Sequence, residues 1–332
     1  MDRVIDLKKP NENEYLYLNT SIHAKTDGVL TKERADRLTE ARSAEDFMRM
    51  LLDFGFAGEQ GATAEEAADN ALREAFGLVE KYAPDKDVYA LFRYPYDCHN
   101  LKSAIKVSYR NKFSYEELAT DLGSADAKEA PAAVLKKDFS VFPKHMATAA
   151  EEAIEAFDKT GDPQRIDLLL DAACYADMLE NAEKHGVDFI ISYIKARIDT
   201  VNVCSAARCI SLSSPLSFFK NVYIVGGTLA LRFFEDAYGS IKDLKEAVLK
   251  TEYGNAVSAS FGHSMSETER AFDILLLKRA VSEYPDTFGE AAAAAYIIIA
   301  EGAGKNIRLA HFGKVNGLEP TKIRERMRDV YV

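Results

Sequence analysis

The chain has 332 residues, of which 47% are hydrophobic and 29% charged, a composition typical of folded globular proteins rather than disordered ones. Its formal net charge is −11, which argues against a nucleic-acid partner because binding to phosphates requires clustered Lys and Arg. The most apolar run, residues 291–300, is shorter than the ~20 residues of a membrane-spanning helix, so we expect a soluble chain without a direct membrane span.

The cysteines and histidines give no sign of a metal or cofactor site. The four cysteines form no Cys-x-x-Cys pattern, which predicts buried, reduced thiols in a cytoplasmic protein. The six histidines are scattered, and none has the spacing of a pattern such as His-Glu-x-x-His. We therefore expect no metal and no cofactor.

The first third of the sequence predicts a series of helices. Thr31 and Ser43 are good N-cap residues, and Ser43 with Asp46 has the pattern of a capping box. A helix rich in Ala, Glu and Leu should end before Pro84. Pro95 suits a first helical turn, so the last helix of this third should restart or kink there. The predicted helices cover residues 14–25, a segment after Thr31, and residues 47–52, 64–82 and 88–112.

The rest of the chain continues the same pattern. Ser114, Ser240 and Ser264 each stand three residues before an acid, a spacing that predicts a helix start. The best strand signal, residues 221–225, ends at a Gly-Gly pair and has no partner run. The sequence therefore predicts an all-α protein, with further helices over residues 143–157, 165–185, 189–210, 244–249, 264–280, 291–310 and 320–327.

An internal repeat organises the chain. Asp97-x-x-Asn100 recurs 102 residues later as Asp199-x-x-Asn202, and Asn306 follows 104 residues after Asn202. In the third copy, Ala303 replaces the acid. A near-constant period indicates repeated structural units, here predicted at residues 1–112, 113–213 and 214–332.

The repeated residues favour a structural role over a catalytic one. Asp97, Asn100 and the aliphatic residue after it fall on one helix face, as expected for close packing with satisfied hydrogen bonds. Asp97 and Asp199 could instead be general bases, but each recurs with its Asn in the same context. We assign structural roles to Asp97, Asn100, Lys102, Asp199, Asn202, Arg208, Asn306 and Arg308.

Two glycine-containing segments resemble nucleotide-binding loops only superficially. Residues 300–306 include Gly304-Lys305, but a P-loop requires Gly five residues before that pair and Ser or Thr after it. Ile299 and Asn306 occupy those positions, so a loosened helix segment is the better interpretation. Gly226-Gly227 lacks the third glycine and the flanking strands of a dinucleotide site, which leaves a helix break.

A basic cluster lies near the C-terminus. Its ordinary interpretation is a solvated helix face, and the alternative is a contact surface for an acidic partner. The residues considered for such a contact are Lys322, Arg324, Arg326 and Arg328.

A set of short motifs is distributed over the whole sequence: Tyr15-x-Tyr17-x-Asn19, Asp97-x-x-Asn100-Leu101-Lys102, Asp199-x-x-Asn202, Gly226-Gly227, Asn306-Ile307-Arg308 and Gly317-Leu318. Together these motifs resemble those of the C subunits of V-type/A-type ATP synthases, which are the counterparts of the d subunit of the eukaryotic V-ATPase. The resemblance covers essentially the full chain. The chain departs from the family at Pro95, at Ala303 and in a long loop over residues 55–63.

The resemblance implies a funnel of three helical units around a pseudo-threefold axis and no active site. It further implies a rotor adaptor on the cytoplasmic face of a membrane, with the central-stalk subunits and the membrane proteolipid ring as partners. Two other interpretations stay open. One is a general α-helical scaffold that binds an unrelated protein, and the other is an all-α enzyme whose acids come from different repeats.

Overall fold

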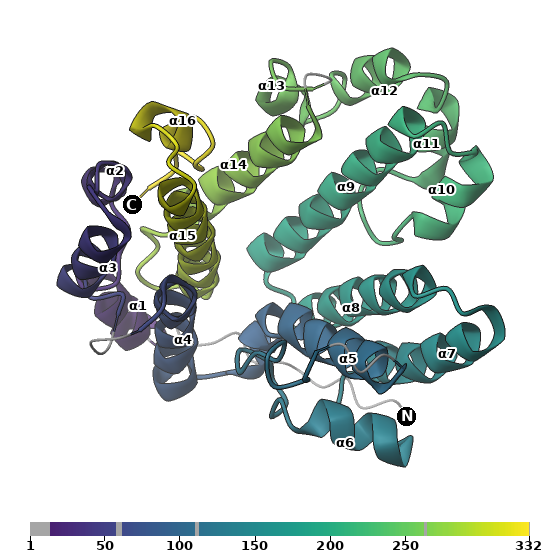
Figure 1. Ribbon diagram of the computed structural model, residues 1–332, viewed down its shortest axis with the longest axis horizontal. Helices are drawn as coiled ribbons and strands as arrows, with labels where there is room; N and C mark the ends of the chain where they lie inside the picture. The colour runs from purple at the N-terminus through teal and green to yellow at the C-terminus, as the bar shows by residue number, and fades with distance from the viewer. Residues whose placement is uncertain (1–13, 58–61, 110–112, 262–263, 332) are drawn as a thin grey trace. The chain divides into compact units, whose positions relative to one another are not determined.

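The computed structural model describes residues 14–57, 62–109, 113–261 and 264–331, and these residues form helices and turns with no β-strand (Figure 1). The all-α prediction is confirmed. Residues 221–225, the best strand signal, lie partly in α10 (Leu216–Val222) and partly in the following loop. Parts of the predicted 55–63 loop and 88–112 helix, residues 58–61 and 110–112, lie outside the described residues.

The chain divides into two compact units. One comprises residues 1–86, 279–325 and 329–332, and the other comprises residues 87–278 and 326–328. The first unit is therefore assembled from both ends of the sequence, whereas the second is almost continuous. The predicted division into three units stays a prediction.

The first unit is built around two long helices, α4 and α15. Its helices are α1 (Leu16–His23), α2 (Lys32–Thr39), α3 (Ala44–Asp53), α4 (Ala64–Tyr82), the end of α14 (Met265–Glu283), α15 (Ala291–Val315) and α16 (Pro320–Arg324). The predicted C-terminal helix over residues 320–327 is thus shorter than expected.

Small side chains allow α4 and α15 to pack closely. The buried face of α4 is rich in alanine, and α15 buries Gly302, Ala303 and Gly304. A Cβ atom added to Gly304 would lie 2.9 Å from the backbone oxygen of Ala68, which is closer than real Cβ contacts. The segment 300–306, expected to be loosened, is continuous helix within α15, and its Gly304 serves this contact.

The second unit contains the remaining helices, and its α7 and α8 form a hairpin (Figure 1). Gly161, with a φ of +67°, ends α7 in the left-handed conformation that glycine adopts without strain. The helices of this unit are the 3₁₀ helix η1 (Asp87–Phe92), α5 (Tyr94–Tyr109), α6 (Glu129–Lys136), α7 (Lys144–Thr160), α8 (Gln164–His185), α9 (Asp188–Ser211), α10, α11 (Leu231–Ala237), α12 (Ile241–Val248), α13 (Gly254–Val257) and most of α14.

Most of the predicted helix starts are confirmed. Thr31, Ser43 and Ser240 each accept a hydrogen bond from the backbone N–H three residues later, and Ser264 accepts one from Glu267. Ser114 is the exception: the Glu117 carboxylate accepts a hydrogen bond from its backbone N–H, but the chain continues in turns. A local side-chain bond of this kind stabilises a turn as readily as a helix.

The restart expected near Pro95 is confirmed. η1 ends at Phe92, and α5 begins at Tyr94, so Pro95 occupies the first turn of α5. The missing N–H of proline costs nothing there, because first-turn N–H groups have no partner within the helix. This restart sets the start of the helix that carries the first motif.

None of the helices in the described part of the chain combines the length and apolarity needed to cross a membrane.

Candidate functional site

The first copy of the motif holds a loop against α5. Asp97 is fully buried and accepts hydrogen bonds from the backbone N–H and the hydroxyl of Ser124, at 3.1 and 2.5 Å, and from the N–H of Ala125 at 3.1 Å. Asn100 donates to the carbonyl of Thr120 at 2.8 Å and accepts from the N–H of the same residue at 3.0 Å. Together these two side chains bind the backbone at both ends of the segment 120–125.

The second copy repeats this arrangement on α9. Asp199 is fully buried and accepts from the N–H and the hydroxyl of Thr228, at 2.9 and 2.6 Å, and from the N–H of Leu229 at 2.9 Å. The Tyr253 hydroxyl adds a fourth hydrogen bond at 2.8 Å. Four donors compensate the carboxylate for its lost hydration.

The second asparagine also matches the first. Asn202 donates to the Ile224 carbonyl at 2.7 Å and accepts from its N–H at 2.8 Å, the same paired bonds that Asn100 makes with Thr120. Both asparagines lie within a helix, at exposures of 0% for Asn202 and 2% for Asn100. The sequence repeat thus corresponds to a repeated set of side-chain to backbone hydrogen bonds.

A glycine completes each of these two anchors. A Cβ atom at Gly123 would lie 2.4 Å from Oδ1 of Asp97, and one at Gly227 would lie 2.1 Å from Oδ1 of Asp199. Only glycine lets the loop backbone approach the carboxylate so closely. The sequence pattern favours only a helix break at Gly227 and singles out no role for Gly123. Their common place after each Asp-x-x-Asn motif is the signal that could have identified them.

The third copy keeps the asparagine without the carboxylate. Asn306 lies in α15 with 2% of its surface exposed, and Ala303 occupies the position of the acid. In the same unit, the fully buried Asn19 donates to the Gly289 carbonyl at 2.9 Å. Buried asparagine is therefore common to all three motif helices, whereas the aspartate anchor belongs to two.

Basic residues on the motif helices pair with acids on a neighbouring long helix. Lys102 and Lys106 of α5 contact Asp171 and Asp167 of α8 at 2.6 and 2.5 Å. Arg208 of α9 contacts Glu269 of α14 at 2.8 Å, and Arg308 of α15 contacts Glu65 and Asp69 of α4. In the first two cases the acidic helix directly precedes the next motif helix. In the third case it precedes the first motif helix, so the pairings follow a cyclic order.

Most residues of the C-terminal basic cluster form intramolecular ion pairs. Arg324 and Arg328 are each bound to acids of their own unit, and Lys322 lies 3.6 Å from its neighbour Glu325. Arg326 is exposed and forms no ion pair with another described residue. A partner contact here stays a prediction, with Lys322 and Arg326 more accessible than the two arginines bound to Asp36, Glu40 and Asp273.

Three ionisable groups on the first two motif helices, Asp97, Cys98 and Cys204, have a raised pKa. Burial raises the pKa of the Asp97 carboxyl, against the lowering effect of its hydrogen bonds from Ser124 and Ala125. A hydrogen bond with Cys174, together with burial, raises the pKa of the Cys98 thiol well above its usual value. Burial likewise raises the pKa of Cys204 to about 12, so these thiols stay protonated and poorly nucleophilic near neutral pH.

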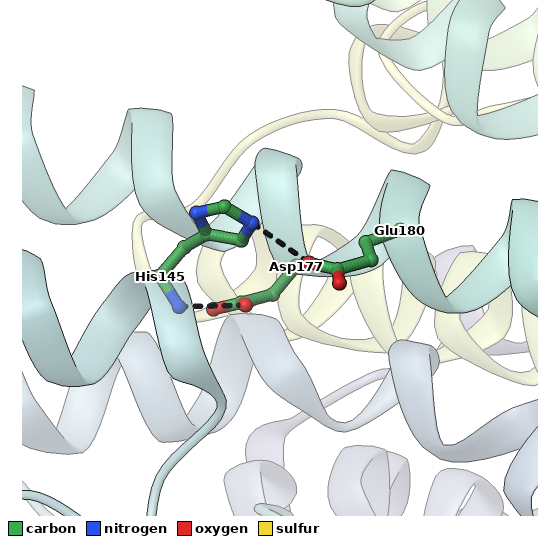
Figure 2. Close-up of side chains that lie close together, drawn as sticks. All are labelled: His145, Asp177 and Glu180. Carbon is green, nitrogen blue, oxygen red and sulfur yellow. Dashed lines mark hydrogen bonds and ion pairs between the residues drawn. The ribbon is translucent and has the colours of Figure 1, made fainter.

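One cluster of possible metal ligands lies elsewhere, on the α7–α8 hairpin. Figure 2 shows His145, from the first turn of α7, beside Asp177 and Glu180 of α8. One ligand atom from each side chain lies within 4.8 Å of the other two. Sequence spacing missed this cluster because His145 is separated from Asp177 by 32 residues and from Glu180 by 35. Only the helix hairpin brings the three residues together.

The chain is similar to known components of rotary ATPases. The family model described as ATP synthase (C/AC39) subunit matches residues 18–326. The A-type ATP synthase C subunit of Thermococcus kodakarensis is 24% identical over 335 aligned positions, covering 95% of this chain and 91% of that protein. The V-type sodium ATPase C subunit of Enterococcus hirae is 20% identical over 336 positions, covering 96% and 99%.

Proposed function

Because the chain belongs to the ATP synthase (C/AC39) subunit family, we propose that it is the non-catalytic rotor adaptor of a V/A-type ATPase or ATP synthase. In this role it is a cytoplasmic protein, peripheral to the membrane, that receives the central stalk and binds the membrane proteolipid ring. It thereby couples rotation of the stalk to ATP-linked transport of protons or sodium. The observation that carries the proposal is the family match, which extends over most of the chain.

The anchors at Asp97 and Asp199 support a mechanical role. An adaptor that transmits torque must keep its loops fixed to its helices under load. Each anchored loop is held by several hydrogen bonds to buried side chains, and the interior around them is closely packed. Close-packed interiors have low compressibility, so they resist deformation.

Exposed apolar side chains support binding to other proteins. Leu135 of α6 is 86% exposed and Phe113 is 63% exposed. Near Phe113, an apolar hollow of about 330 Å³ is lined by Val107, Tyr109 and Leu118 among others. Apolar surface of this kind is typical of sites at which one protein of a complex contacts its neighbours.

The proposal includes that the chain itself does not catalyse ATP hydrolysis. The segment that resembles a P-loop in sequence, residues 300–306, is helical throughout. Its backbone N–H groups therefore face along the helix axis and cannot surround a phosphate. We expect the isolated chain to bind no ATP at micromolar concentrations in calorimetry and to hydrolyse none. Stoichiometric micromolar binding would favour the enzyme interpretation instead.

Reconstitution tests the adaptor role directly. The purified chain is mixed with its cognate central-stalk subunits and with the detergent-solubilised proteolipid ring, and each complex is followed by gel filtration. We expect the chain to bind both, and to bind the ring more weakly as salt increases because exposed charges are screened. If it binds neither at low or moderate salt, the adaptor role is wrong and a general helical scaffold becomes the better interpretation.

A further inference from the structure

We propose that His145, Asp177 and Glu180 form a binding site for a divalent transition-metal ion such as Zn²⁺ on the α7–α8 hairpin (Figure 2). The side chains offer one imidazole nitrogen and two carboxylate oxygens, which are ligand types that Zn²⁺ accepts. Tetrahedral Zn²⁺ with bonds near 2.1 Å places its ligand atoms about 3.4 Å apart. The observed ligand atoms lie within 4.8 Å of one another, so small side-chain rotations bring them to this spacing.

The hairpin holds the buried ligand in place before any metal arrives. Asp177 is 5% exposed, and its two carboxylate oxygens accept hydrogen bonds from the backbone N–H groups of His145 and Met146 at 2.9 and 2.8 Å. Metal-binding carboxylates are commonly oriented by such outer hydrogen bonds. Each oxygen keeps a second lone pair, which remains available to an ion.

The charges of the cluster formed by His145, Asp177 and Glu180 favour binding of a cation. Asp167 and Asp171, earlier on α8, pair with lysines of α5. Within the described residues, by contrast, Asp177 forms no ion pair with Lys or Arg, and Glu180 pairs only with His145, at 2.8 Å. A divalent ion would neutralise carboxylate charge that no Lys or Arg of the described residues neutralises.

The positive end of α7 opposes a cation but does not outweigh the acids. The N-terminus of a helix carries roughly +0.5 elementary charge, and its effect falls off within one turn. The two carboxylates together carry up to two negative charges. The net charge at the cluster is therefore negative, and it favours binding of a cation over an anion.

Exposure allows an ion to enter and leave. The side chains of His145 and Glu180 are 42% and 59% exposed. Three protein ligands leave a coordination position for water, as in open zinc sites. We therefore expect an exchangeable site, whose occupation links the start of α7 to the later part of α8 and stabilises the hairpin.

The test uses the reduced full-length chain and Zn²⁺ in isothermal titration calorimetry. We expect one equivalent of Zn²⁺ to bind in the micromolar range. His145→Gln and Glu180→Gln each remove one ligand and should weaken binding by about tenfold or more. Glu183→Gln is the matched control, because it removes an acid from the same helix that pairs with Lys195 and is not a ligand. Its affinity should equal that of the unsubstituted chain.

Two further measurements keep the result unambiguous. Zn²⁺ should raise Tm for the unsubstituted chain and for the Glu183→Gln variant, but not for His145→Gln. Bound Co²⁺ should give a visible spectrum without the near-ultraviolet charge-transfer band of thiolate ligands, which excludes binding by the cysteines. The proposal is overturned if no Zn²⁺ binds at micromolar concentrations, if both ligand variants bind as well as the control, or if the thiolate band appears.

Discussion

At the scale of the residue, Asp199 links two elements to α9 through one side chain. Its carboxylate accepts from the loop at Thr228 and Leu229 and also from the Tyr253 hydroxyl, which comes from the start of α13. Burial and this hydrogen bond raise the pKa of Tyr253, so the hydroxyl remains a donor. Neutral donors thus stabilise the buried carboxylate.

Asn202→Ala should lower the free energy of unfolding by about 1–3 kcal/mol, because it leaves the buried N–H and carbonyl of Ile224 without partners. Denaturant unfolding followed by circular dichroism measures the change. Asn221→Ala is the control, since Asn221 is exposed on α10 and its removal should change stability by less than about 0.5 kcal/mol. Equal effects of the two substitutions would contradict the anchoring role of Asn202.

Gly227→Ala should destabilise the protein by about 1–3 kcal/mol, because the new methyl group would overlap the carboxylate of Asp199 and push the loop away from α9. Gly77→Ala is a control of opposite sign. Gly77 lies within α4 with nothing within 4 Å of an added Cβ, so alanine there should stabilise by about 0.5–1 kcal/mol. Thermal unfolding of both variants decides the matter, and a neutral Gly227→Ala would mean that the loop is not held as described.

Tyr115 should lose its hydroxyl proton at a higher pH than an ordinary tyrosine. Its hydroxyl donates to the Ala127 carbonyl at 2.6 Å, and burial raises its pKa from the ordinary 10 to about 12. Since the raised pKa belongs to the folded state, the stabilisation is complete below pH 10 and is lost as pH rises through about 12. Ultraviolet titration of tyrosinate should show one fewer late-titrating group in Tyr115→Phe. Loss of a group that titrates near pH 10 would refute the assignment.

At the scale of the element, the start of α4 depends on a capping box. Thr63 accepts from the Glu66 N–H, and the Glu66 carboxylate accepts from the Thr63 N–H at 2.6 Å. Thr63→Ala should destabilise the protein by about 1 kcal/mol, whereas Thr63→Ser keeps the hydroxyl and should be nearly neutral. Hydrogen exchange in the first turn of α4, measured for both variants, separates the loss of the cap from a general loss of stability. Matching exchange rates in the two variants would argue against the cap.

Helices were predictable because their signals are local. The caps at Thr31, Ser43 and Ser240, and the glycine or proline that follows several helices, specify where a helix begins or ends without reference to the rest of the chain. The helix expected over residues 165–185 spans Gln164–His185, and the one expected over residues 189–210 spans Asp188–Ser211. Ser114 failed because its local bond is compatible with a turn as well as a helix.

The pairing of helices could not be predicted in the same way. Burial of the repeated asparagines followed from their periodic spacing, but their partners, such as the backbone of Ile224, lie in loops without a strong pattern. The cluster around His145 depends on how α7 folds back on α8, which no spacing in the sequence encodes. Local signals specify elements, whereas contacts between distant elements depend on the whole set of packing choices.

At the scale of the whole molecule, the ion pairs between long helices follow the order of the sequence repeat. α5 pairs with α8, which precedes the second motif helix, and α9 pairs with α14, which precedes the third. The third motif helix, α15, pairs with α4, which precedes the first motif helix. These pairs are partly exposed, and each is worth only about 0–1 kcal/mol. Their value lies in specificity, because opposite charges favour the correct neighbour among three similar helices.

The first unit combines segments that are far apart in the sequence, and this sets the order in which the chain folds as it is synthesised. α4 packs on α15, but about 200 residues separate the end of α4 from the start of α15. At a synthesis rate of about 5–20 residues per second, α15 is synthesised on the order of 10–40 s after α4, and until then the alanine-rich face of α4 is not buried by it. The second unit, almost continuous in sequence, leaves the ribosome within that interval and can fold first. The first unit therefore completes its core only after α15 has been synthesised, and a chain cut short before α15 leaves α4 without the partner that buries it.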